Sequence, residues 1–138
     1  MLRCMVYLST ATHLMPEPEL LELLEEARSK NADIGVTGML LYSDGNFIQA
    51  IEGESVAVGN LYNKIGRDSR HYGVQTLVDE EITERSFGDW NMGFYSASRA
   101  QLAALPGYSQ FMNPEAKISD ILGDTDALEM LRVFKEHN

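Results

Sequence analysis

The stretch GVTGMLLYSDGNFIQAIEG, residues 35–53, decides the fold of this chain of 138 residues. Two apolar runs lie on either side of Asp44-Gly45, a dipeptide that favours a two-residue hairpin turn because both residues tolerate positive φ. Alternation divides the second run between two faces, with Phe47, Gln49 and Ile51 on one and Ile48, Ala50 and Glu52 on the other. Because both faces are largely apolar, we expect this strand to be central in a sheet and covered on both sides.

A glutamine in the middle of such a strand needs hydrogen-bonding partners, because an unpaired buried amide costs about 1–3 kcal/mol. Two other polar side chains are predicted to reach the same layer. Tyr7 has the parity of Met5 on the first strand, and Asn31 continues the apolar stripe of the first helix, four residues after Ala27. We therefore expect Tyr7, Asn31 and Gln49 to lie together between the sheet and its helices.

Charge and cysteine content exclude several classes of function. The chain carries 21 acidic and 11 basic residues, a net charge of −10, which argues against nucleic acid as a partner. The single Cys4 predicts a buried, reduced thiol, and His13, His71 and His137 lack the spacing of metal ligands. No apolar run is long enough to span a membrane, and the start of the chain does not resemble a signal peptide, so we expect a cytoplasmic protein.

The order of predicted elements is βαββαββ, followed by a helical tail. This order indicates an α+β, ferredoxin-like fold with a mixed sheet and crossing helices. The expected strands are Leu2–Ser9, Gly38–Tyr42, Asn46–Ile51, Val74–Val78 and Asn91–Tyr95, and the expected helices are Glu19–Lys30 and Val56–Gly66.

Two helices are expected on one face of the sheet and the tail helices on the other. Alternation points Arg3, Met5 and Tyr7 toward the first two helices. Cys4, Val6 and Leu8 then face the tail, whose last helix carries Leu128, Leu131 and Phe134. We expect residues 1–95 to form the core and residues 96–138 a C-terminal helical cap of the same domain.

Tyrosine, asparagine and glutamine form a hydrogen-bonding wall without a nucleophile–base pair, so we expect no enzyme. Amides offer donors and acceptors on one planar group, which suits the edge of a flat heterocycle. The residues alone leave a second interpretation open, in which each of these groups satisfies a neighbour in the core.

Five pieces of sequence together resemble the BLUF family, the blue-light sensors using FAD. They are Tyr7; Asn31 with Gly35-Val36-Thr37-Gly38; the run from Leu41 to Gly53; Asp68-x-Arg70-His71; and Phe87-x-x-Trp90-x-Met92. Each piece is common by itself, but their order and spacing over residues 1–95 are jointly specific. The resemblance implies a photoreceptor that binds FAD non-covalently, with two helices on the flavin side of the sheet.

The resemblance also implies roles for individual residues. Asn31 would bind the polar edge of the flavin ring, and Gln49 would lie between the ring and Tyr7. Other implied flavin contacts are Lys64 and Asp68 beside the ring or ribityl chain, Arg70 and His71 near the chain and phosphates, and Phe47 and Ile65 as apolar walls. Without the family, residues 68–71 would be interpreted as a solvated turn.

The mechanism implied by the family begins with excitation of the flavin by blue light. Tyr7 gives up an electron and a proton, and recombination leaves Gln49 rotated or tautomerised, with a slight red shift in absorption. Trp90 and Met92 would pass this change through the last strand to the C-terminal helices. The alternative to a signalling role for this pair is ordinary core packing.

The expected output is a homo-oligomer or a separate downstream signalling protein, with neither nucleic acid nor membrane as partner. A competing interpretation is a flavin-free, ferredoxin-like module that binds a ligand or another protein. A small acylphosphatase-like hydrolase fits poorly, because no arginine-bearing anion loop follows the first strand.

Overall fold

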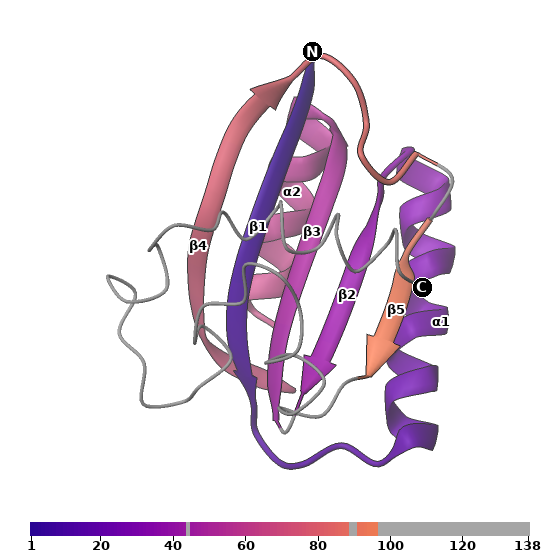
Figure 1. The fold of residues 1–138 in the computed structure, drawn as a ribbon, viewed down its shortest axis with the longest axis vertical. Helices are drawn as coiled ribbons and strands as arrows, with labels where there is room; N and C mark the ends of the chain where they lie inside the picture. The colour runs from indigo at the N-terminus through magenta and orange to yellow at the C-terminus, as the bar shows by residue number, and fades with distance from the viewer. Residues whose placement is uncertain (44, 89–90, 97–138) are drawn as a thin grey trace, which may run out of the picture.

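A computed structural model describes residues 1–43, 45–88 and 91–96, and for Tyr95 and Ser96 only the backbone. Five strands form one mixed sheet, and two helices cover the face that points away from the viewer in Figure 1. The elements are β1 (Leu2–Ala11), α1 (Glu17–Ile34), β2 (Thr37–Ser43), β3 (Asn46–Glu54), α2 (Ser55–Gly66), β4 (His71–Ile82) and β5 (Gly93–Ser96).

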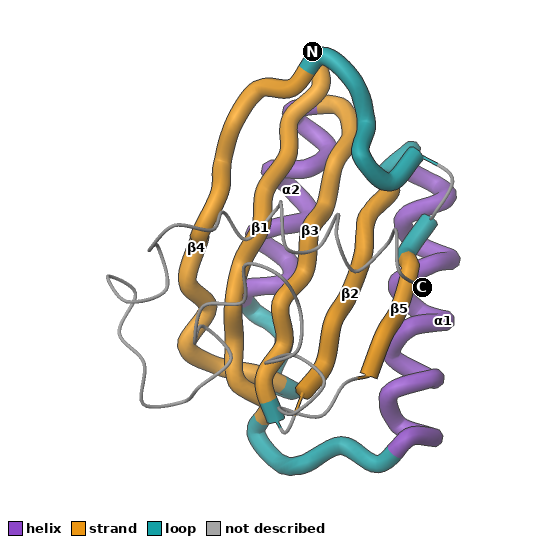
Figure 2. The backbone as a smooth tube through the Cα atoms, in the orientation of Figure 1, coloured by secondary structure: helices purple, strands orange, loops and turns teal. Residues whose placement is uncertain are grey.

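The strand order in the sheet is β4-β1-β3-β2-β5. α1 connects β1 to β2 and α2 connects β3 to β4, and in each case one other strand lies between the two that the helix connects. β1 lies between β3 and β4 and is antiparallel to both, while β2 pairs antiparallel with β3 and parallel with β5 (Figure 2). The predicted α+β fold with the order βαββαββ is confirmed. The C-terminal helices, predicted for the opposite face of the sheet, lie outside the described residues.

The β2–β3 hairpin has the register that the sequence predicts. Tyr42 pairs with Phe47 across the turn, and Gly45 has a φ of +88°, which a residue with a side chain rarely adopts. β3 is buried from Asn46 to Gly53, so the strand is central, as predicted. Gln49 is thereby placed in the middle of the sheet.

Helix α1 is longer at both ends than the predicted Glu19–Lys30. Pro18 lies in its first turn, where proline lacks only an N–H that has no partner within the helix. At the other end Gly35 adopts the left-handed conformation, with φ of +68°, and the Val36 N–H donates to the Asn31 carbonyl at 2.9 Å. The added turn carries Asn31 inside the helix. β4 also exceeds its prediction, because pairing with β1 continues past the apolar run, whereas β5 begins at Gly93 rather than Asn91.

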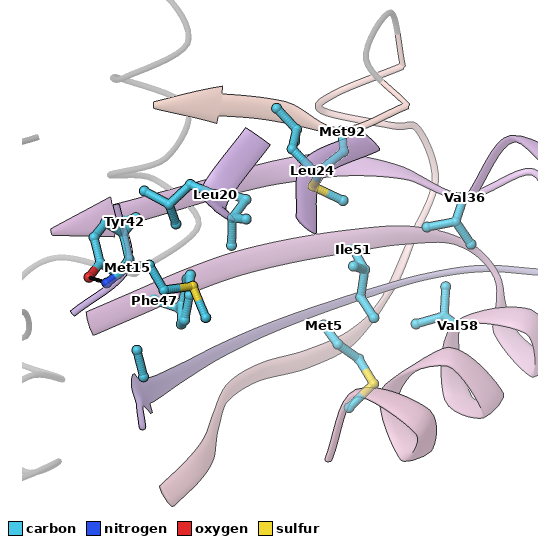
Figure 3. Close-up of a cluster of buried hydrophobic side chains, with 12 residues drawn as sticks. Met5, Met15, Leu20, Leu24, Val36, Tyr42, Phe47, Ile51, Val58 and Met92 are labelled. Carbon is cyan, nitrogen blue, oxygen red and sulfur yellow. Dashed lines mark hydrogen bonds between the residues drawn. The ribbon is translucent and has the colours of Figure 1, made fainter. Parts of the chain in front are cut away.

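The core between sheet and helices contains residues from most of the described elements (Figure 3). Met5, Leu20, Leu24, Val36, Ile51, Val58 and Met92 are among its buried side chains. The predicted facing of β1 is confirmed for Met5 and Tyr7, which lie on the helix side. Cys4 and Val6, of opposite parity, are buried as well.

Glu52 is a fully buried carboxylate that fixes the segment after β4 to the centre of the sheet. Its oxygens accept hydrogen bonds from the Ser86 N–H at 2.9 Å, the Phe87 N–H at 2.6 Å and the Thr37 hydroxyl at 3.2 Å. Arg85 donates to the Thr37 hydroxyl at 2.9 Å. These bonds compensate for the loss of water around the charge, and they hold the chain that leads toward β5.

Candidate functional site

A cavity of about 160 Å³ lies on the sheet between α1 and α2. Its floor comes from β1, β2 and β3, and its sides from the two helices and the turn before β4. The lining residues are Tyr7, Leu23, Glu26, Ala27, Lys30, Asn31, Leu40, Phe47, Gln49, Leu61, Lys64, Ile65, Asp68, Arg70 and His71.

A hydrogen-bonded chain of three side chains crosses the floor of the cavity. The Tyr7 hydroxyl donates to Oε1 of Gln49, and Nε2 of Gln49 faces the sulfur of Met92 at 3.4 Å. Tyr7 and Gln49 are paired residues on β1 and β3, so the backbone ladder aligns them. The polar partner that the sequence required for Gln49 is therefore Tyr7. The sulfur of Met92 accepts the hydrogen bond from the nitrogen of the same amide.

The environment of Tyr7 keeps its phenol protonated. Burial is the main cause that raises the pKa of Tyr7 above its usual value, and the charges of Asp68 and Tyr62 act in the same direction. The Tyr7 ring makes edge contacts with Tyr62 and His71, at centroid distances of 6.0 and 6.1 Å. Because the phenolate is disfavoured, an electron can leave Tyr7 at low cost only if the proton leaves with it.

Asn31 is 2% exposed and is directed into the cavity from the last turns of α1. Its Nδ2 donates to the Asn91 carbonyl at 3.1 Å. No bond to its Oδ1 is found among the described residues. One side of the amide is therefore held by the chain before β5, and the other is available to a bound group.

Charged residues surround the opening of the cavity. Arg70 binds Asp68 through two nitrogens and contacts Glu26 of α1 at 3.1 Å. Hydrogen bonding to Arg70 is the main cause that lowers the pKa of Asp68, and the same bond raises the pKa of Arg70. Lys30 and Lys64 also line the cavity, so several cations lie near the place where an anionic tail would leave it.

His71 is held at both ring nitrogens. Nε2 lies 2.6 Å from the Ile65 carbonyl, which only accepts, so this nitrogen carries the hydrogen. Nδ1 lies 2.8 Å from the Ser9 hydroxyl. The ring joins the end of α2 to β1 and stands edge-on to Phe47, so it fixes the shape of this wall.

The structure brings together the nine described residues that the sequence predicted for the pocket. Tyr7, Asn31, Phe47, Gln49, Lys64, Ile65, Asp68, Arg70 and His71 all line the cavity. Met92 is 1% exposed and contacts Gln49, whereas Trp90 lies outside the described residues. Their functional roles stay predictions.

The sequence analysis did not assign Leu23, Leu40 and Leu61 to the site, although all three line the cavity. Glu26 was missed because its contact is with Arg70, 44 residues away. Lys30, the last residue of the predicted first helix, also lines the cavity while remaining exposed.

The cavity fits a flat heterocycle with a polar edge and an anionic tail. Its walls are aliphatic and aromatic, its floor presents the amides of Gln49 and Asn31, and its opening carries lysines and arginine. Among the described residues, no group of His, Cys, Asp or Glu could hold a metal ion, and no helix is long and apolar enough to cross a membrane. The fold and cavity thus define a small α+β module with a ligand-binding pocket between its two helices.

Comparison with known proteins identifies the family. Residues 2–93 match the family model described as "BLUF: Sensors of blue-light using FAD". Because that match covers most of the chain, the protein belongs to the BLUF family. The resemblance predicted from the sequence is confirmed, and the matched region belongs to a family of blue-light sensors.

Two curated relatives and one solved structure show the extent of the similarity. Photoactivated adenylate cyclase subunit beta of Euglena longa is 36% identical over 117 residues, which are 84% of this chain and 13% of that protein. The blue light- and temperature-regulated antirepressor BluF of Escherichia coli K12 is 30% identical over 69% of this chain and 24% of its own length. The structure "BlrB - a BLUF protein, dark state structure" has a TM-score of 0.78 and 31% identity, over 99% of this chain and 97% of that chain. The chain therefore spans a small part of the two curated relatives but nearly all of the solved one.

Proposed function

We propose that this chain is a blue-light photoreceptor that binds FAD non-covalently between α1 and α2. The observation that carries the proposal is the chain from Tyr7 through Gln49 to Met92 on the cavity floor. Such a chain connects a phenol, which can be oxidised, to a strand that leads out of the site. The family description supports flavin as the cofactor.

Residues of this chain would hold each part of the cofactor. Phe47 and Ile65 supply apolar walls, and Asn31 and Gln49 supply the polar edge. Lys64 and Asp68 flank the ring or ribityl chain, and Arg70 and His71 lie toward the chain and phosphates. The choice of FAD as the flavin rests on the family description.

Tyr7 is the proposed electron and proton donor. A bound flavin would supply blue-light absorption and, once excited, a one-electron acceptor. Burial raises the pKa of Tyr7 and so keeps its phenol protonated in the dark. A phenol that loses an electron becomes strongly acidic, so the proton would leave together with the electron. The hydroxyl already points at Oε1 of Gln49, so the proton has an acceptor within hydrogen-bonding contact.

Gln49 is the proposed switch, because its amide has a donor end and an acceptor end. Its oxygen faces Tyr7 and its nitrogen faces Met92. Rotation or tautomerisation of the amide after return of the electron and proton would change the partners of both ends. The cofactor ends oxidised, so the product is a rearranged hydrogen-bond network and not a converted substrate.

Met92, together with Trp90, is the proposed exit of the signal toward residues 96–138, which we propose as a helical cap on the core formed by residues 1–95. The relatives carry names of an adenylate cyclase and an antirepressor, which supports an effector or partner protein as the receiver. A homo-oligomer is the other proposed receiver. We propose that the protein acts in the cytoplasm.

Absorption spectroscopy of the purified protein tests the function. A flavin spectrum that moves slightly to the red under blue light and returns in darkness supports the proposal. The same spectrum distinguishes the alternative, a flavin-free ferredoxin-like module, because such a protein is colourless and does not take up added FAD.

A further inference from the structure

Two neighbouring residues of α1 hold two neighbouring carbonyls just before β5. Asn31 Nδ2 donates to the Asn91 carbonyl at 3.1 Å, and Arg28 Nε donates to the Met92 carbonyl at 2.9 Å. Arg28 and Asn31 are three residues apart, so they lie on the same side of the helix. α1 runs beside β5 in Figure 1, and these bonds join the helix to the two residues that precede the strand.

Met92 lies one residue before the first paired residue of the edge strand. β5 has four residues, forms the edge of the sheet, and pairs with β2 only from Gly93 onward. Met92 precedes the first paired residue, and yet its side chain is 1% exposed and its sulfur contacts Gln49. The bond from Arg28 is a direct restraint by α1 on the backbone of Met92.

The space for the Met92 side chain is narrow. A Cβ on Gly38 would lie 3.2 Å from Met92 Cε and 2.0 Å from the Ala50 carbonyl oxygen, so the thioether lies over a position where β2 has no side chain. A displacement of the Met92 backbone would therefore move the sulfur relative to Gln49, which the sulfur contacts at 3.4 Å.

We propose that Arg28 is a positioning residue of the light response, which holds Met92 against Gln49 and couples α1 to the start of β5. This inference rests on the proposed function and adds a residue outside the cavity lining. Hydrogen bonds from a charged donor are shorter and stronger than neutral ones. Arg28 forms no ion pair within the described part of the chain, and its Nε donates to the Met92 carbonyl.

The proposal can be tested first without light or cofactor. Met92-Gly93 is the only Met-Gly pair in the chain, and Asn91-Met92 is the only Asn-Met pair. Carbonyl ¹³C labelling of the first residue and ¹⁵N labelling of the second therefore give one NMR peak for each carbonyl. In Arg28→Met, which keeps an unbranched side chain of good helix propensity, we expect the Met92 carbonyl peak to move upfield. Arg28→Lys, which keeps a cationic donor, should restore it in part.

The matched control is Arg67→Met, which removes an exposed arginine just after α2 and should leave both peaks in place. An Arg28→Met protein whose Met92 peak stays at the wild-type position would overturn the proposal. Thermal unfolding of the variants confirms that the peaks belong to folded protein.

The second test measures the response itself by hydrogen exchange of residues 91–96, in darkness and under blue light. We expect Arg28→Met to keep the red shift, because Tyr7 and Gln49 are unchanged, but to exchange several-fold faster in darkness and to lose most of the light-induced change. An unaltered light-induced change, with a displaced Met92 peak, would overturn the role of Arg28 in the response. A wild-type protein without a red shift would instead refute the proposed function, while the dark NMR result would still report on the carbonyl bond.

Discussion

Substitution of Tyr7 by phenylalanine removes one oxygen atom from the floor of the cavity. Tyr7 and Gln49 are 4% and 6% exposed, so the loss of the hydroxyl leaves the Gln49 oxygen without its donor in a nearly dry site. An unsatisfied buried acceptor costs about 1–3 kcal/mol. The buried hydroxyl itself no longer has to be desolvated, and the edge contacts of the ring with Tyr62 and His71 remain. We expect a net loss of about 1 kcal/mol in the free energy of unfolding.

This small loss predicts that Tyr7→Phe folds, keeps the cavity and binds flavin, but shows no reversible red shift. Phenylalanine has no hydroxyl proton to release together with an electron, so no proton reaches the amide of Gln49. The assay combines urea unfolding with dark and illuminated absorption spectra. Tyr62→Phe is the matched control, since Tyr62 lies beside Tyr7 but its hydroxyl contacts Thr76, and it should keep the red shift. A normal photocycle in Tyr7→Phe would refute the reasoning.

Met92→Ala should keep the colour change but abolish light-induced differences in hydrogen exchange of residues 97–138; unchanged differences would contradict this role. Glu52→Gln should lower the free energy of unfolding by about 1–3 kcal/mol in urea titrations, because an amide N–H would then face the Phe87 or Ser86 N–H; wild-type stability would show that these bonds contribute little. Asp68→Asn should lower the melting temperature at about pH 7, and by progressively less as the pH falls below about 4. The pKa of Asp68 is lowered in the folded state, so its stabilisation is complete above the unfolded pKa of about 4 and is lost as pH falls through the folded value. A difference in melting temperature that stays the same as the pH falls would refute the assignment.

The fold was largely predictable because local signals and alternation agree. Asp44-Gly45 fixed the hairpin, and two apolar faces identified β3 as the central strand. The bounds of α1 were predicted less well, because its last turn, residues 31–34, mixes polar and apolar residues, and only Gly35 marks its end. β4 was underestimated since its outer residues are polar and are held by pairing with β1.

The site was predictable where side chains follow the parity of a strand or helix. Tyr7, Gln49 and Asn31 are such residues, and they line one cavity. Trp90 and Met92 have the same parity, so alternation could not separate their positions, and the structure describes only Met92. Arg28 and Glu52 were beyond prediction, because their partners lie on a connection whose path depends on tertiary packing.

The most direct measurement is the visible spectrum of the protein purified in darkness, recorded before and after blue light. The account predicts a bound flavin whose absorption shifts slightly to the red and recovers in darkness. A colourless protein that does not take up added FAD would contradict it, and would leave Tyr7, Asn31 and Gln49 as polar residues of the core.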